Sequence, residues 1–289
     1  METFDLFWMP KNIQKLTFRC PPIRENMRGE LGVEGTMIAD WCLLTTFRAL
    51  SLPSLLSIFS SALLEKPILF VSSNLWLLSS VVFSVSVLLQ PLKWQGLQAP
   101  ILPSKMHDLL DAPVPYLFGV QKIPEKRNLL GTAYDRSEWE GVIVDIERNT
   151  VIVKNNPLSS LPQVSKLEKK LKVHAESLYT PNQVFHPATV TMKEMNTVND
   201  VLWCFLQYTK WLSDAISASL LVAFKDIFGA DFSMKTTISA SATIAEHGEY
   251  KRKKEVALLK FLKKIAPQNQ AFVDKFIQTQ MFTDYSEKK

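Results

Sequence analysis

The side chains best suited to metal binding and nucleophilic catalysis are scattered in this sequence. Its four histidines have no Cys-x-x-Cys or His-x-x-x-His spacing around them, which leaves a zinc site without its usual pattern: His107, His174, His186 and His247. Only nine glycines occur, and neither G-x-x-x-x-G-K-[ST] nor G-x-G-x-x-G nor G-x-S-x-G is present. We therefore expect no metal, no cofactor and no residue that catalyses a covalent reaction.

A carboxylate in an apolar setting is the next candidate. The segment 141–154, GVIVDIERNTVIVK, has two β-branched runs separated by Glu147, Arg148 and Asn149, which predicts a hairpin. Asp145 stands where a strand normally places an apolar residue. We interpret it as an edge or turn-facing carboxylate rather than a catalytic one.

Basic residues gather near the end of the chain. Residues 251–289 hold ten Lys/Arg against four Asp/Glu, while the whole chain has a net charge of +5. Leu258, Phe261, Leu262 and Ile265 predict an amphipathic helix whose other faces are basic. Such a face is usually only solvated; the alternative is contact with an anionic membrane through seven residues: Lys251, Arg252, Lys253, Lys254, Lys260, Lys263 and Lys264. The remaining chain has no matching basic stripe, so we expect no nucleic-acid partner.

The uncharged run between Pro67 and Pro91 determines the choice of fold class. Its twenty-three residues are long enough to cross a bilayer, yet eight of them are polar. Ser72, Ser73 and Asn74 divide it into a short β-branched run and a segment long enough for a helix. These polar residues favour a buried strand followed by a buried helix over a membrane span near residues 68–90.

The other elements complete an α/β prediction, with a mainly parallel sheet flanked by helices and then a mostly helical C-terminal part. We expect an irregular segment over 1–39, helices from Asp40 and from about Leu52 to Leu64, and a short helix over Ser104–Leu110 within a proline-rich connection. Lys166–Lys172 predicts a short exposed helix, 174–197 has no clear period, a helix begins near Asn199, and 229–249 reads as a loop. Three unpaired cysteines indicate a reducing compartment.

Three ordered strings carry a resemblance to a known family. They are ALLEKPILFVSS, then PILPSKMHDLLDAPVPYLFGV, then GVIVDIERNTVIV, and the final FLKKIAPQNQAFVDKFIQTQMFTDY is similar to a downstream module of the same family. Together they resemble the DENN domain over about residues 40–285. The resemblance implies an irregular remnant over 1–39, a central α/β module over 40–165 and a helical module over 166–289 packed on it.

The family resemblance also implies a function. DENN proteins combine a longin-like lobe with an α/β lobe and accelerate nucleotide release from Rab GTPases in vesicle trafficking, without a cofactor. Pro103, Asp111, Pro113 and Pro115 match the family's signature loop, and each has either a structural or a partner-binding role. We expect a cytoplasmic protein, peripheral on intracellular membranes.

The upstream part departs from the family pattern. About forty residues precede the central module, too few for a longin lobe. Either another subunit supplies that lobe, or the chain is a shortened form, or it is a fragment. The alternative function is a DENN-like scaffold that binds a Rab, a trafficking partner or membrane without promoting exchange.

Overall fold

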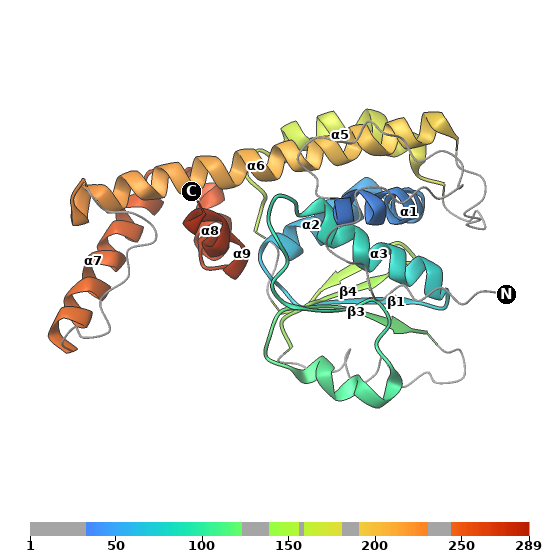
Figure 1. Ribbon diagram of the computed structural model, residues 1–289, viewed down its shortest axis with the longest axis horizontal. Coiled ribbons are helices and arrows are strands. Elements are labelled where there is room, and N and C mark those ends of the chain that lie inside the picture. Colours follow the sequence, from blue (N-terminus) through green and yellow to red (C-terminus); the bar gives the residue numbers. More distant parts are fainter. Residues whose placement is uncertain (1–32, 123–138, 156–158, 181–190, 231–243, 289) are drawn as a thin grey trace.

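The computed structural model describes residues 33–122, 139–155, 159–180, 191–230 and 244–288. They form an α/β layer structure, and a long helix lies across its top and extends past one end (Figure 1). A mostly parallel five-stranded sheet is flanked by helices, and the C-terminal part is helical. The predicted fold class is confirmed.

The sheet has the order β2-β3-β1-β4-β5. At its centre, β1 (Ile68–Ser72) is buried along its whole length, as a β-branched and apolar run between two neighbours should be. It pairs in parallel with β3 (Tyr116–Gln121) and β4 (Val142–Asp145). β2 (Leu97–Ala99) lies parallel to β3. β5 (Thr150–Val153) is antiparallel to β4, which confirms the predicted hairpin.

The uncharged run is not one membrane span, because it divides as its serines indicated. Residues 68–72 form β1, and α3 (Leu75–Leu88) follows after a polar turn. Asn74 caps this helix, since its Oδ1 accepts hydrogen bonds from the backbone N–H groups of Trp76 and Leu77 at 3.0 and 3.2 Å. Across the described ranges, no helix combines the length and hydropathy that a membrane crossing needs.

Helices cover the two faces of the sheet unequally. The upper face is covered by α1 (Val33–Ala49), α2 (Leu52–Leu63) and α3, whose apolar side chains form the main core. The lower face has a smaller core under the short helix η1 (Ser104–Asp111). Seven buried residues form it: Leu69, Val71, Leu102, Tyr116, Phe118, Val120 and Ile143.

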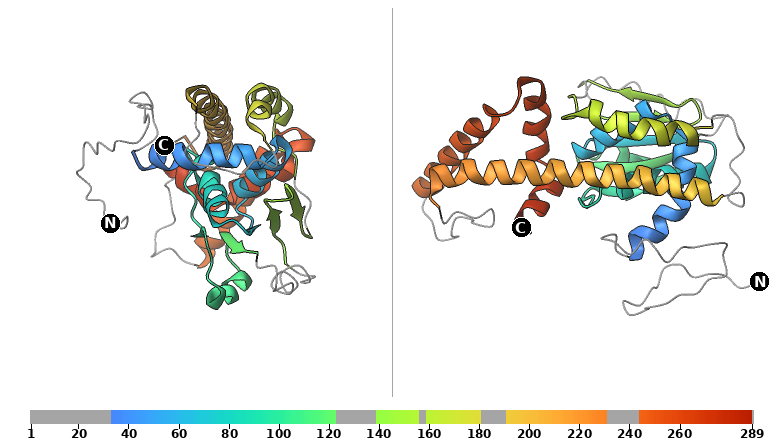
Figure 2. Two further views of the ribbon diagram at one scale, coloured as in Figure 1. Left: turned by 90° about the vertical axis from the view of Figure 1, so that its right-hand side faces the viewer. Right: turned by 90° about the horizontal axis from the view of Figure 1, so that it is seen from above.

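The helical part begins with α5 (Val164–Leu178) and α6 (Met192–Phe228), which run side by side along the top (Figure 2). Beyond the sheet, α6 packs against α7 (Ile244–Leu262), and α8 (Pro267–Ile277) and α9 (Gln280–Glu287) return toward the sheet. The N-terminus of α6 is fixed by a capping box between Thr191 and Glu194. Glu194 also pairs with Arg48, which joins α6 to α1.

Four predicted boundaries in the helices are wrong. The first helix begins at Val33 rather than Asp40, so the end of the predicted irregular segment is helical; residues 1–32 lie outside the described ranges. α5 continues to Leu178 rather than ending at Lys172. Its last two buried residues are Ala175 and Leu178, and the polar residues around them obscured the apolar pattern in the sequence. α6 starts at Met192 and α7 at Ile244, where few apolar residues mark the first turns.

Candidate partner-binding site

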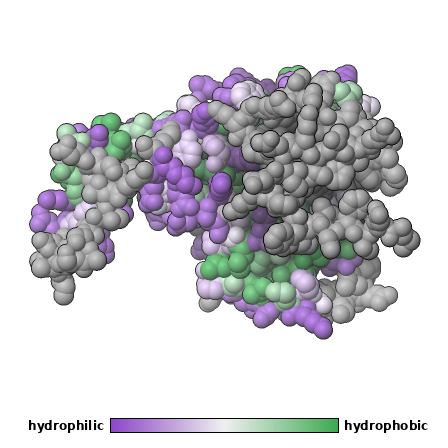
Figure 3. All heavy atoms as spheres, in the orientation of Figure 1, coloured by the Kyte–Doolittle hydropathy of each residue, from purple (hydrophilic) through white to green (hydrophobic). Residues whose placement is uncertain are grey.

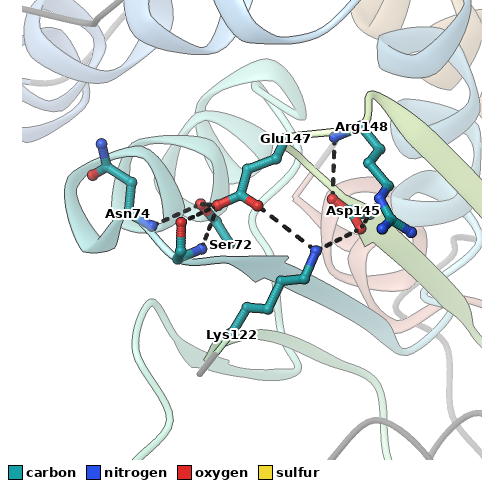
Figure 4. Close-up of polar contacts among 7 residues, drawn as sticks. Ser72, Asn74, Lys122, Asp145, Glu147 and Arg148 are labelled. Carbon is teal, nitrogen blue, oxygen red and sulfur yellow. Dashed lines mark hydrogen bonds and ion pairs between the residues drawn. The ribbon is translucent and has the colours of Figure 1, made fainter. Parts of the chain in front are cut away.

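Polar side chains meet at one edge of the sheet, where three parallel strands end. Ser72 ends β1, Lys122 follows β3 directly, and Asp145 ends β4. In open α/β sheets the carboxyl ends of parallel strands are the usual location of binding sites. We call the group formed by Ser72, Ser73, Lys122, Asp145, Glu147 and Arg148 the carboxyl-edge cluster (Figure 4).

Lys122 lies between two carboxylates of this cluster. Its Nζ is 3.3 Å from Asp145 Oδ2 and 3.7 Å from Glu147 Oε2. Asp145 is 7% exposed, so its charge needs these partners. The backbone N–H of Arg148 donates a further bond of 3.1 Å to Asp145 Oδ1, which fixes the turn between β4 and β5. Asp145 is therefore buried on an inner strand and faces the turn, which is one of the two expected alternatives, and it holds that turn in place.

Glu147 links the same turn to the start of α3. Its Oε1 accepts a hydrogen bond of 2.6 Å from the backbone N–H of Ser73, and the hydroxyls of Ser73 and Ser72 also donate to it. Desolvation alone would raise the pKa of Glu147, but these hydrogen bonds and the nearby Lys122 charge hold the pKa below its ordinary value of 4.5. The carboxylate thus occupies a position near the helix N-terminus that favours an anion.

Three exposed side chains lie at this edge of the sheet, two beside the cluster and one, Arg148, within it. Leu75 and Trp76, in the first turn of α3, are each 40% exposed. Arg148, in the β4–β5 turn, has a side chain that is 76% exposed. Trp and Arg are the residue types that most often anchor protein interfaces, and here the hydrogen bonds of Asn74 and Glu147 fix the backbone that carries them.

This arrangement suits binding to a protein better than catalysis. The charged groups of the cluster neutralise one another. Asp145 and Glu147 both form ion pairs with Lys122 and do not surround a space in which a metal ion could bind. Within the described ranges, no group of three or more His, Cys, Asp or Glu side chains has the geometry of a metal site. The cluster is a rigid frame for the exposed residues around it.

The predicted signature-loop residues lie elsewhere. Pro103 precedes η1, and Asp111, Pro113 and Pro115 lead from η1 to the start of β3. This start is the amino end of the parallel strand, opposite to the carboxyl-edge cluster. The first three are exposed and Pro115 is half-buried. Asp111, Pro113 and Pro115 thus lie away from the cluster, whereas Pro103 follows the carboxyl end of β2, directly after Leu102, whose N–H donates to the Gly119 carbonyl of β3.

The signature loop borders an apolar surface of its own. Figure 3 shows hydrophobic side chains low on the face of the molecule, below the sheet. In the β2–η1–β3 segment, the exposed large apolar residues are Leu97, Ile101, Met106 and Val114, at 41–46% exposure. Tyr116 supports this segment from inside, because its hydroxyl donates a 3.2 Å hydrogen bond to the Leu110 carbonyl and its ring stacks on Phe118. Burial raises the pKa of Tyr116 to about 12.

The seven predicted basic residues all lie on exposed positions, four in the middle of α7, one near its end and two just after it. The predicted apolar stripe packs inward: Phe261 is buried, and Leu258, Leu262 and Ile265 are partly buried. Two of the lysines have carboxylate partners, since Lys253 lies 2.7 Å from Glu249 and Lys260 lies 3.0 Å from Asp226. These lysines are far from the carboxyl-edge cluster, because α7 lies beyond the opposite end of the sheet (Figure 1).

The sequence analysis missed the cluster because its members are separated along the chain. Lys122 and Asp145 meet only because β3 and β4 both pair with β1. One signal was available: polar residues directly after apolar strands meet at a common edge when the strands are parallel. Nothing in the sequence marked Trp76 as exposed, since it lies within the uncharged run.

Comparison with known proteins agrees with the resemblance stated above. Residues 26–149 match the DENN (AEX-3) domain. The chain is 34% identical over 128 residues to DENN domain-containing protein 1B of Mus musculus, covering 44% of this chain and 16% of that protein. It is 33% identical over 130 residues to DENN domain-containing protein 1A of Homo sapiens, covering 44% and 12%.

A fungal protein shows similar agreement. Elicitor of plant defense protein 1 of Verticillium dahliae is 33% identical over 129 residues, covering 45% of this chain and 10% of that protein. The chain thus spans only 10–16% of the length of these three relatives.

Proposed function

Residues 26–149 are a DENN domain, and on this premise we propose that the chain binds a Rab-family GTPase and takes part in GDP release from it. The role would be that of a DENN-type guanine nucleotide exchange factor, or a piece of one, in vesicle trafficking on intracellular membranes. The observation that carries the proposal is the match itself, which covers β1, α3, β3 and β4 and hence the whole carboxyl-edge cluster.

Such an activity needs no covalent chemistry from this chain. An exchange factor binds the nucleotide-poor GTPase more tightly than the GDP form, and this difference in affinity lowers the barrier to release. The required feature is a rigid surface with anchoring side chains. Leu75, Trp76 and Arg148 supply exposed anchors. The hydrogen bond that Ser73 donates to Glu147 and the ion pair between Lys122 and Asp145 fix the backbone that carries them.

The second lobe of the family is part of the proposal. A longin-like lobe, in the same protein or on another subunit, would complete the GTPase-binding cleft. The apolar surface around Leu97, Ile101, Met106 and Val114 is a second place where a protein can dock, because exposed apolar groups of this kind mark interaction sites. Pro103, Asp111, Pro113 and Pro115 border that surface and are assigned to it as partner contacts.

A second candidate is a DENN-like scaffold that holds a Rab without opening it. It is favoured by the mutual neutralisation of Lys122, Asp145 and Glu147, which leaves these three charges paired with one another rather than directed at a partner. The two candidates share the binding surface and differ only in the effect on the nucleotide.

Release of a fluorescent GDP analogue from a panel of Rab proteins separates them. The exchange proposal expects faster release from at least one Rab, with or without an added longin lobe. Retention of a Rab on the immobilised chain together with unchanged release would support the scaffold. If the folded chain neither retains a Rab nor changes release from any of them, both candidates are overturned.

A further inference from the structure

The solvent face of α7 combines exposed aliphatic side chains with exposed basic side chains. Val256 and Leu259 are 55% and 60% exposed. Arg252 and Lys263 are also exposed, and the spacings of four, three and four residues place all four side chains within about 60° of one helix face. Lys263 continues the helical pattern, since its backbone N–H donates a 3.1 Å bond to the Leu259 carbonyl. We call Arg252, Val256, Leu259 and Lys263 the α7 ridge.

The buried side of α7 fixes the direction of this ridge. Ala257 and Phe261 are 0% and 1% exposed and pack into the main core. The centre of this buried pair lies about 150° around the helix from the centre of the ridge, so the ridge points away from the protein. Figure 1 shows α7 beyond the end of the sheet, where the described elements do not cover its outer side.

We propose that the α7 ridge docks on an anionic lipid bilayer, with Val256 and Leu259 inserted among the headgroups and the basic residues on the lipid phosphates. Charge complementarity supports this occupant: the segment 251–264 contains seven Lys/Arg and only one acidic residue, Glu255. Interfacial helices of this type bind by buried apolar area together with attraction of Lys and Arg to anionic lipid.

The distribution of the charges favours a bilayer over another macromolecule. Besides the ridge, Lys251, Lys253, Lys254 and Lys260 are exposed on several sides of the helix. An extended anionic surface attracts all of them, whereas a protein partner would need a carboxylate placed for each one. A nucleic acid would leave the two aliphatic side chains at the centre of the ridge without a contact.

Docking by α7 also sets the orientation of the molecule. The carboxyl-edge cluster lies at the opposite end of the sheet from α7 (Figure 1). A bilayer bound to the ridge therefore leaves Trp76 and Arg148 directed away from the lipid and open to a partner. This inference does not depend on which partner the chain binds.

Sedimentation of the whole chain with vesicles tests the proposal. We expect binding to vesicles of phosphatidylcholine with phosphatidylserine, little binding to phosphatidylcholine alone, and loss of binding as salt is raised. Arg252→Gln together with Lys263→Gln should weaken binding by about 25-fold, because each basic residue near the surface contributes about fivefold. The matched control is Lys169→Gln with Lys170→Gln on the exposed side of α5, which should bind as the unchanged chain does.

A probe on the ridge tests the apolar part. An environment-sensitive fluorophore on Leu259→Cys should shift to the blue on addition of the anionic vesicles, and the same fluorophore on Val173→Cys of α5, a residue that is 75% exposed, should not. The proposal is overturned by equal binding to neutral vesicles, by no binding at all, by an unchanged affinity of the double Gln variant, or by the absence of a shift at residue 259. Nucleotide release from Rab proteins is measured separately, so failure here leaves the proposed function intact.

Discussion

Lys122 Nζ lies 3.3 Å from Asp145 Oδ2, although Lys122 follows β3, Asp145 ends β4 and the two residues are 23 positions apart. The contact exists because β3 and β4 flank β1 in parallel and end at the same edge. It keeps a carboxylate that is almost fully buried next to a cation, and it positions the turn that carries Arg148. The frame of the proposed binding site therefore depends on this pair.

Replacing Lys122 should destabilise the fold. Lys122→Met leaves the buried Asp145 charge with only the Arg148 contacts, and we expect a loss of about 1–3 kcal/mol in the free energy of unfolding. Lys122→Met combined with Asp145→Asn should cost less than the sum of the two single changes. Urea unfolding measures all three, with Lys105→Ala on the exposed side of η1 as the control. Additive effects of the two changes would show that the pair is not coupled.

Two buried serines of α3 should respond oppositely to the same substitution. Ser80 and Ser84 are both 0% exposed, but Ser84 Oγ lies 2.7 Å from Thr46 Oγ1, whereas the hydroxyl of Ser80 has no hydrogen-bond partner among the described residues. Ser84→Ala should lower the free energy of unfolding by about 1 kcal/mol. Ser80→Ala should leave it unchanged or raise it, because it removes an unsatisfied polar group. Equal losses in thermal unfolding of the two variants would contradict this account of the α3 core.

Glu65 joins the sheet layer to the last helix. Its Oε2 and Oε1 accept hydrogen bonds from the backbone N–H groups of Gln280 and Met281, at 2.9 and 2.8 Å, in the first turn of α9. Glu65→Ala should therefore speed hydrogen exchange of these amides and lower stability by about 1 kcal/mol. Amides of α3 serve as the internal control and should change no more than the global stability does. Unchanged exchange at Gln280 and Met281 would mean that Glu65 does not hold α9.

Glu147 should make stability depend on pH on the acid side. Because the folded state lowers the pKa of Glu147, its contribution is complete above its ordinary value of 4.5 and is lost as pH falls through the lower folded pKa. Glu147→Gln should therefore lose less stability than the unchanged protein as pH falls below 4.5. Urea unfolding across that range measures the difference. Parallel curves for the two proteins would show that Glu147 carries no such effect.

The central fold was predictable because local signals agreed with one another. The short apolar run that begins at Ile68, the polar break at Ser72, Ser73 and Asn74, and the apolar segment after it each favoured the strand and helix that the structure contains. The serines of α3 argued correctly against a membrane span. Ser84, for example, is buried and hydrogen-bonded to Thr46 rather than exposed to lipid. Helix starts were harder to predict, as at Ile244, which lies within the segment 229–249 that was expected to be a loop.

The candidate site was less predictable than the fold. Pro103 and Pro115 stand in a recognisable string, but that string leads to the amino end of β3. The carboxyl-edge cluster draws its six residues from the ends of three strands and has no motif of its own. Only the pairing order of the sheet brings Lys122, Asp145 and Glu147 together.

The most direct test of the central claim is the retention of nucleotide-free Rab proteins on the immobilised chain. We expect at least one member of the Rab panel to bind, and we expect Trp76→Ala to weaken that binding by about tenfold or more, as truncation of an interface Trp commonly does. Val173→Ser, an exposed apolar change on α5, is the matched control and should leave binding unchanged. If the folded chain retains no Rab, or if Trp76→Ala binds as well as Val173→Ser does, the carboxyl edge of this sheet is not the GTPase-binding site.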